Sequence, residues 1–328
     1  MALKQVLDVY EILDDIHVNG EVVTEYAKSK GILDATYTRV DEGKGPTDFI
    51  RLVIPGRNGK LNGGKAPTLG IIGQLGGIGA RPERIGFVSD GDGALSAVAT
   101  AIKLIDMVGK GDQIDGDVIV STHICPTAPT MPHDPVPLMG SPVDSATNVK
   151  LTVDPDMDAI LSVDTTKGNR ILNKRGFALT PTVKAGYILH ISEDLLQIQQ
   201  TSTGELPCVL ALTTQDITPY GNGLYHMNSI LQPCCGTDAP VVGVAITTES
   251  SVPGCATGAT HEVDVAEVVQ FCVEAAKEFT AGKCSFYDKD EFEMIQKLYG
   301  SMKVLQTRGN QYFYHKIWTT TGSISRWF

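Results

Sequence analysis

Apolar segments that do not alternate with polar residues are the feature that most constrains the fold of this chain. Three short runs of this kind, each bounded by turn residues, are APTLGIIGQLG, DGDVIVSTHICP and MDAILSVDTT. Such strands are buried on both faces, which is typical of parallel strands covered by helices. Between and after them, SDGDGALSAVATAIKLIDMVG and VDVAEVVQFCVEAAKEF space their apolar residues three and four apart, as amphipathic helices do. We therefore predict an α/β fold, a three-layer sandwich with a central mixed, mostly parallel sheet.

The other segments give weaker evidence for secondary structure and domain organisation. Residues 3–30 have helical apolar spacing, and Phe49–Ile54 and VVGVAITTE read as further strands. Residues 126–150 are rich in proline and are interpreted as a long ordered loop. We expect one α/β domain over residues 1–283. Residues 284–328 are expected to form a helix and an aromatic tail that packs on the body or on another subunit, as in a homo-oligomer.

Charge and cysteine usage narrow the class of protein. The chain has 27 Lys and Arg against 38 Asp and Glu, a net charge of -11, and no basic cluster. Nucleic-acid binding relies on such clusters, so a nucleic-acid partner is not expected. No apolar run approaches the length of a membrane span and the first residues lack signal-peptide character, so we expect a cytoplasmic protein without a membrane partner. The seven cysteines include no CxxC pair, so a zinc ribbon is not expected either.

Polar residues gather where the predicted strands end. Gln74, Asp90 with Asp92, His123 with Cys125, and Asp164 lie at or just beyond such ends, and His261 precedes the last long helix. Ligands of open parallel sheets collect at this edge. Each residue alone has a plainer interpretation: an aspartate before a helix caps it, and a single histidine is usually structural. Their joint order predicts a site for one divalent ion, most readily zinc, since imidazole and carboxylate suit it.

The same order of motifs resembles the co-catalytic zinc exopeptidases, the clan of aminopeptidases and carboxypeptidases. IHVNGEVVTEYAKSKGI resembles their opening helix pair, SDGDGALSAVATAIKL their bridging-aspartate turn, and DAILSVDTT the strand with a ligand aspartate. CGTDAP followed by GATHEVDVAEVV resembles their terminal histidine region. The resemblance covers about residues 5–280. It implies a divergent, uncharacterised prokaryotic family of this fold that carries only a domain-of-unknown-function label.

Carried over by position, the resemblance implies Asp90 as the bridging ligand and Asp164 and His261 as further ligands. The clan's His-x-Asp is replaced by Gln74-Leu75-Gly76, and its Glu-Glu by Cys125-Pro126. A two-metal hydrolase needs ligands for both ions and a base for the bridging water. These losses leave a reduced site that holds one ion if His123 joins the set, or no ion at all if the site is degenerate.

Three functions follow from these observations. The first is a metal-dependent hydrolase of an amide or peptide C–N bond in a small substrate, with His123 and Asp92 as catalytic residues and Gln74 and Glu249 toward the substrate; the general base stays unassigned. The second is a non-catalytic relative that serves as a binding or self-assembling protein. The third is an amidase in which Cys125 is the nucleophile beside the His123 imidazole.

Overall fold

The protein is an α/β sandwich around one mixed sheet of nine strands. The computed structural model describes residues 2–74, 78, 86–128, 130–132, 137–212, 227–255 and 257–306. The main strands of the sheet are β1 (Asp34–Asp41), β2 (Pro46–Ile54), β3 (Leu69–Gly73), β4 (Val118–Ile124), β7 (Ala159–Thr165) and β11 (Val241–Thr247). The short strands at its far end are β8 (Gly176–Leu179), β9 (Val183–Lys184) and β10 (Tyr187–Ile188).

Parallel pairing is confined to the centre of the sheet. The strand order is β1-β2-β4-β3-β7-β11-β9-β10, with β8 also on β11. The pairs β3–β4, β3–β7 and β7–β11 are parallel, and the pairs toward both edges are antiparallel. Four neighbouring strands therefore end at the same edge, which we call the carboxyl edge. The fold class predicted from the sequence is confirmed.

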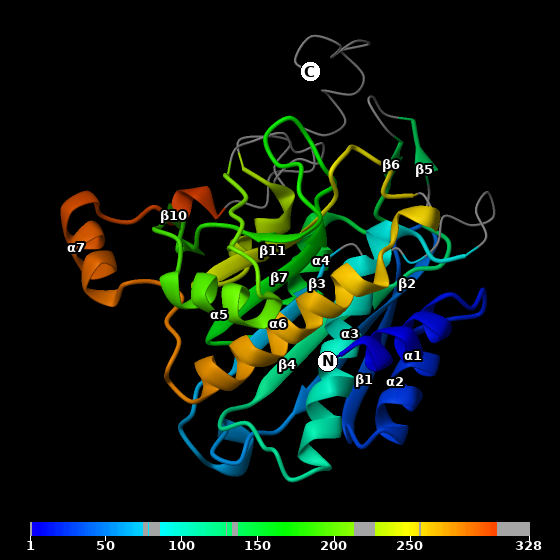
Figure 1. Cartoon of the computed structure of the whole chain (residues 1–328), viewed down its shortest axis with the longest axis horizontal. Coiled ribbons are helices and arrows are strands. Elements are labelled where there is room, and N and C mark those ends of the chain that lie inside the picture. Colours follow the sequence, from blue (N-terminus) through cyan, green and yellow to red (C-terminus); the bar gives the residue numbers. More distant parts are fainter. Residues whose placement is uncertain are drawn as a thin grey trace.

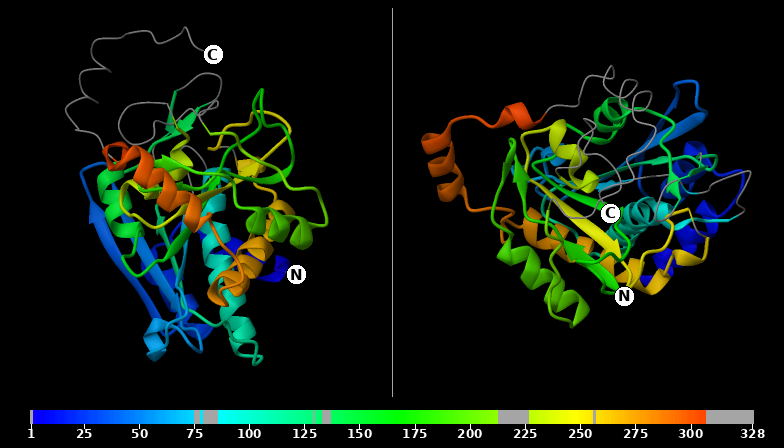
Figure 2. Two further views of the ribbon diagram at one scale, coloured as in Figure 1. Left: turned by 90° about the vertical axis from the view of Figure 1, so that its left-hand side faces the viewer. Right: turned by 90° about the horizontal axis from the view of Figure 1, so that it is seen from above.

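The helices divide into two layers of unequal size. α1 (Leu3–Leu13), α2 (Gly20–Ser29), α3 (Asp92–Val108), α5 (Glu193–Thr203) and α6 (Glu262–Thr280) pack with one face of the sheet, which we call the helical side (Figure 1). α4 (Ser145–Thr152) and a 3-10 segment at Ser229–Cys235 lie over the other face, the α4 side. Figure 2 shows the long β1–β2 hairpin at one margin of the molecule.

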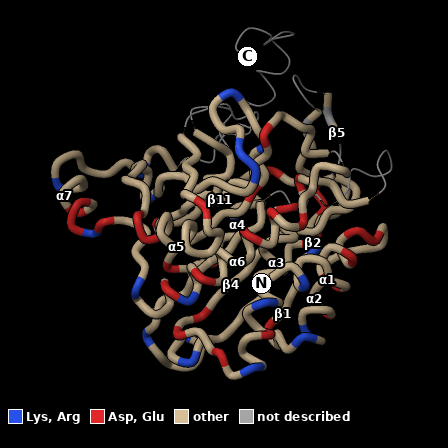
Figure 3. Tube along the Cα trace, in the orientation of Figure 1, with Lys and Arg blue, Asp and Glu red and all other residues tan. Residues whose placement is uncertain are grey.

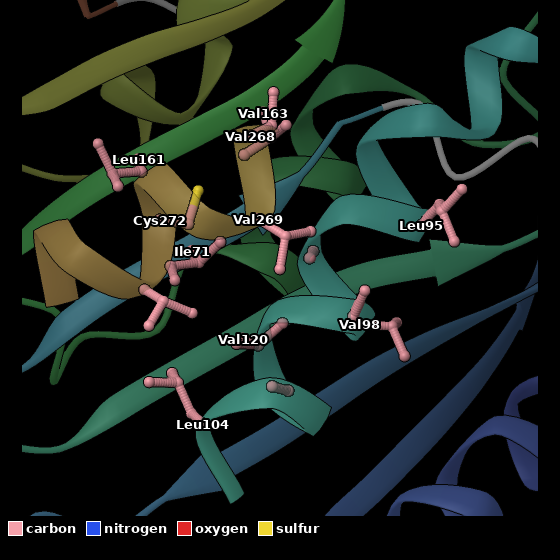
Figure 4. Packing of buried hydrophobic residues seen from close by; sticks show 14 of the residues in the cluster. Ile71, Leu95, Val98, Leu104, Val120, Leu161, Val163, Val268, Val269 and Cys272 are labelled. Carbon is pink, nitrogen blue, oxygen red and sulfur yellow. The ribbon is translucent and has the colours of Figure 1, made fainter. Parts of the chain in front are cut away.

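Strand alternation builds a core on each side of the sheet. Along β4, Val118 and Val120 join the large cluster on the helical side, while Ile119 joins the smaller cluster on the α4 side. β3, β7 and β11 repeat this alternation, as strands covered on both faces do. Figure 4 shows the helical-side cluster, in which Val98 of α3 and Val269 of α6 pack against Ile71 and Val120 of the sheet.

The start of α3 is pressed against the strand ends. A Cβ atom on Gly93 would lie 2.5 Å from the carbonyl oxygen of Gln74 and 2.6 Å from that of Val163. Only glycine permits this approach of helix backbone to strand backbone. The glycine thus fixes the beginning of α3 at the carboxyl edge, between the ends of β3 and β7.

The structure departs from the sequence prediction in the segment 126–150. This segment is not a loop throughout: it contains two short paired strands, β5 (Thr130–Met131) and β6 (Leu138–Met139), and most of α4. The α4 residues lack apolar periodicity, but the Asp144 side chain accepts a hydrogen bond from the backbone N–H of Thr147 and so caps the helix. β1, the short strands β8 to β10 and α5 were also not predicted.

The predicted helix after residue 283 is present as α7 (Lys289–Tyr299). It lies at the margin of the molecule, away from the central sheet (Figures 1 and 2). Phe292 anchors it against Ala185, Leu189 and Tyr287. The aromatic tail falls mainly in 307–328, outside the described residues, so the domain division at residue 283 and self-association through the tail stay predictions.

None of the described helices combines the length and the apolar character that crossing a membrane requires.

Candidate functional site

The carboxyl edge brings together polar residues from six separate segments. Gln74 follows β3, His123 lies near the end of β4, Asp164 lies near the end of β7, and Glu249 follows β11. Asp90 and Asp92 lie in the turn that begins α3, and His261 is the residue before α6. The sequence thus predicted the edge at which these residues lie, and their contacts divide them into three groups.

The first group is a buried carboxylate pair at the start of α3. Asp90 is 7% exposed and Asp92 is 1% exposed. Thr260 Oγ1 donates a hydrogen bond of 2.7 Å to Asp92 Oδ1, while Asp92 Oδ2 makes no hydrogen bond within the described residues. Burial raises the pKa of Asp90 to about 6 and that of Asp92 to about 7, in each case against the opposing effect of Lys167. Because burial disfavours the charged form, each carboxylate depends on the nearby cation.

Lys167 is that cation, and sequence reasoning did not identify it. Its Nζ lies 3.5 Å from Asp92 Oδ2 and donates a hydrogen bond of 3.2 Å to the carbonyl oxygen of Ala259. Its side chain is only 9% exposed. The loop that carries it, after β7, also contains Arg170, Lys174 and Arg175, and appears as blue segments above the sheet in Figure 3. The signal that could have found it is a lysine placed three residues after a strand-end aspartate.

The second group lies on the α4 side of the sheet. His123 shares this side with Ile119 by strand alternation, and it is 2% exposed. Its Nδ1 lies 2.8 Å from Thr47 Oγ1, and its ring stacks on Phe49 with centroids 5.1 Å apart. Burial lowers its pKa to about 4, so the imidazole is neutral at pH 7.

Gln74 and Asp164 belong to the same row as His123. The ladders pair Ile72 of β3 with Ser121 of β4 and with Ser162 of β7. Continued by two residues, this register places Gln74 between His123 and Asp164. Gln74 is 5% exposed and Asp164 is 4% exposed, and Asp164 Oδ1 accepts a hydrogen bond from the backbone N–H of Thr165. The sheet therefore presents a buried polar row across β4, β3 and β7.

Cys125 lies close to this row but lacks the surroundings of a nucleophile. It is 1% exposed, and its Sγ contacts the carbonyl oxygen of Pro46 at 3.8 Å. Burial raises the pKa of the thiol, whereas an activated nucleophile needs a lowered pKa. The neutral His123 imidazole supplies no positive charge to reverse this effect. A catalytic Cys125 stays a prediction, and its local electrostatics oppose it.

The third group lines an open hollow of about 350 Å³. Glu249 and His261 lie in its wall together with Arg175, Thr248 and Ser250. Arg175 donates from Nε to Asp264 Oδ2 at 3.2 Å and from Nη2 to Asp264 Oδ1 at 3.0 Å. This pair uses two of the five N–H donors of the guanidinium.

The hollow adjoins the carboxylate pair through one segment of chain. Ala259 lines the hollow, and its carbonyl oxygen accepts the hydrogen bond from Lys167. Thr260, the next residue, binds Asp92. The segment 258–261 therefore separates the open hollow from the buried charges. It brings His261 to the hollow.

These contacts test the zinc centre that the resemblance implies. The expected ligands were Asp90, His123, Asp164 and His261. Within the described parts of the chain, no three His, Cys, Asp or Glu side chains are grouped so that they could hold an ion. Nδ1 of His123 faces Thr47, and the cation beside the aspartates is an ammonium. The described residues therefore do not fit a zinc centre. His133 and Asp134, in the proline-rich segment 126–150, lie outside the described residues.

Comparisons with known proteins agree with the fold. The DUF1177 family, described as "Protein of unknown function (DUF1177)", matches residues 38–309. The sequence has no significant match among curated proteins. A tomato leucine aminopeptidase variant superposes with a TM-score of 0.51 at 12% identity, over 83% of this chain and 61% of that chain. The Caenorhabditis elegans leucine aminopeptidase gives 0.50 at 11% identity, over 87% of this chain and 66% of that chain.

At such low identity the similarity shows the fold alone. This chain spans less than two thirds of the length of either aminopeptidase. The resemblance to the exopeptidase fold, and to a family known only by a label for unknown function, is confirmed.

Proposed function

Because the chain belongs to the DUF1177 family of proteins of unknown function and has the fold of leucine aminopeptidases, we propose that it binds a small peptide-like molecule at its carboxyl edge. The observation that carries this proposal is the hollow lined by Arg175, Glu249 and His261. Its volume of about 350 Å³ falls within the range of small-molecule sites.

The charges of the hollow support a ligand with both an acidic and a basic group. Asp264 orients the Arg175 guanidinium from one side, which leaves its remaining N–H donors for a ligand carboxylate or amide oxygen. Glu249 is exposed and offers an acceptor for an ammonium group. A zwitterionic molecule, such as a short peptide, matches both.

Calorimetric titration with a dipeptide, its N-acetylated form and its C-amidated form tests this proposal. We expect the unmodified dipeptide to bind most tightly and each modification to weaken binding about tenfold, the cost of one lost charge-assisted contact. Glu249→Gln should bind the N-acetylated and the unmodified dipeptide with equal affinity, because the carboxylate that binds the ammonium group is absent.

Glu205→Gln is the matched control. Glu205 is also exposed, pairs with Lys174 at 2.8 Å and does not line the hollow. Equal binding of all three ligands, or of none, would contradict the proposal, as would a loss of affinity in the Glu205 variant that equals the loss in the Glu249 variant.

A second candidate is hydrolysis of a C–N bond in the bound molecule. The observation that favours it is an imidazole and a carboxylate, His261 and Glu249, in the wall of one hollow. These are the residue types that serve as general acid and base. Product analysis of dipeptides and amides, with and without added zinc or manganese, tests it. His261→Gln should abolish turnover and leave dipeptide affinity within about threefold, whereas Cys125→Ser should leave both unchanged.

A further inference from the structure

Three loops enclose the ammonium group of Lys167. The loop after β7 supplies the lysine, the start of α3 supplies Asp92, and the segment before α6 supplies Ala259 and Thr260. These segments are far apart in the sequence and meet only at the carboxyl edge. With 9% of its side chain exposed, Lys167 is not a typical surface lysine.

The atoms around the ammonium are oxygens. Asp92 Oδ2 lies 3.5 Å from Nζ, and the carbonyl oxygen of Ala259 lies 3.2 Å from it. Thr260 holds the other carboxylate oxygen of Asp92 by a hydrogen bond and so orients the group. Carboxylate, carbonyl and hydroxyl oxygens are also the ligands that manganese, magnesium and calcium prefer.

The charge of Lys167 acts on both buried aspartates. It opposes the effect of burial on Asp90 as well as on Asp92. Two carboxylates that are less than a tenth exposed need a compensating positive charge to stay ionised. In an exopeptidase-like edge the expected source of that charge is a metal ion, and here it is a side chain of the protein.

We propose that the Lys167 ammonium takes the place of a metal ion at this edge. Lys167 is the built-in cation for Asp92, and the wild-type chain does not bind a divalent ion at this carboxylate. Removal of the ammonium leaves a space beside the oxygens of Asp92 and Ala259. A contraction of about 1 Å would bring these oxygens to the 2.3–2.6 Å typical of calcium, or slightly closer for manganese.

Manganese binding followed by electron paramagnetic resonance tests this assignment, because free and bound Mn²⁺ give different signals. Wild-type protein, Lys167→Ala and the double variant Lys167→Ala/Asp92→Asn are titrated with manganese chloride after treatment with a chelator. We expect no bound ion in the wild type, about one per chain in Lys167→Ala, and none in the double variant. Thermal unfolding is measured in parallel. Lys167→Ala should lose about 5 °C or more in Tm and regain it with manganese.

Two results would overturn the proposal. One is a wild-type chain that binds one manganese ion and loses it through Asp92→Asn. The other is a folded Lys167→Ala protein that binds no manganese. If Lys167→Ala does not fold even with manganese, the double variant decides: folding restored by Asp92→Asn supports an unbalanced charge as the cause, and continued failure to fold contradicts it.

Discussion

The two sides of the sheet bury polar residues at the same edge in different ways. On the helical side, Asp92 is 1% exposed and remains beside a cation, Lys167. On the α4 side, His123 is 2% exposed, and burial keeps it neutral between Thr47 and Phe49. Similar burial therefore gives an ion pair in one place and an uncharged ring in the other.

At this edge the neighbouring side chain, rather than the depth of burial, decides whether a buried residue is charged. A buried carboxylate with a lysine 3.5 Å away has a positive charge that partly offsets its lost hydration, while burial lowers the pKa of the His123 imidazole and removes its proton. The edge residues thus do not form one electrostatic unit, which is the physical reason that the expected ligands do not gather around one ion.

The largest expected effect comes from removal of the cation on the helical side. Lys167→Met keeps most of the side-chain volume and leaves Asp92 buried without its partner. We expect a loss of about 3–5 kcal/mol in the free energy of unfolding at pH 8, as for a broken buried pair. Urea unfolding measures it. Asp92→Asn added to Lys167→Met should restore most of the loss. If the effects of the two substitutions on the free energy of unfolding were simply additive, Lys167 would stabilise the protein by packing. Its role as the cation for Asp92 would then be contradicted.

The next effect is a pH dependence on the α4 side. The pKa of His123 is about 4 in the folded protein against 6.5 for the free side chain, so its contribution to stability is fully present above pH 6.5 and is lost as pH falls toward 4. The loss over that interval is of the order of 3 kcal/mol. His123→Phe should flatten this part of the stability profile.

His17→Gln serves as the control for the histidine variant, because His17 is exposed and lies far from this row in the sequence.

The buried aspartates make stability depend on pH in the opposite direction. Their raised pKa values mean that their contribution is present below about pH 4 and is lost as pH rises through 6 to 7. Asp92→Asn should therefore reduce the fall in the free energy of unfolding that occurs as pH rises through 6 to 7. If His123→Phe and Asp92→Asn changed the pH dependence of stability in the same way, the two sides of the sheet would not differ in how they treat buried charge.

A smaller effect should follow from crowding the start of α3. Gly93→Ala places a methyl group 2.5 Å from the carbonyl oxygen of Gln74, and backbone cannot rotate away as a side chain can. We expect a loss of about 1–3 kcal/mol, measured by urea unfolding. Gly109→Ala, at the end of the same helix, is the control, since its nearest neighbour would be 3.6 Å away. If Gly109→Ala lowered the free energy of unfolding as much as Gly93→Ala, the close approach of Gly93 to the strand ends would not explain the effect.

The smallest effect concerns the thiol of Cys125. Its burial and raised pKa predict that iodoacetamide labels it at least about tenfold more slowly than the half-buried Cys235 at pH 8. Mass spectrometry of peptides from timed reactions measures both rates. Faster labelling at Cys125 would revive the amidase hypothesis and would require a positive charge near His123.

Sequence patterns were sufficient for the elements with strong apolar periodicity. α3 and α6 carry apolar residues three and four apart, and β3, β4 and β7 are continuous apolar runs, so each was predicted close to its observed bounds. β1 was missed because most of its residues are exposed, and α4 because its stability comes from a cap and from contacts rather than from an apolar stripe.

The candidate site was predictable only as a location. Parallel strands end at one edge, so the sequence was enough to predict that Gln74, His123 and Asp164 lie at that edge. The side of the sheet that each residue faces, and its partner there, depends on contacts between segments as distant as 92 and 260. A lysine, rather than a set of ligands around an ion, lies beside the buried Asp92. This pairing depends on the folding of distant segments onto one another, because local sequence does not encode which distant charge completes a buried pair.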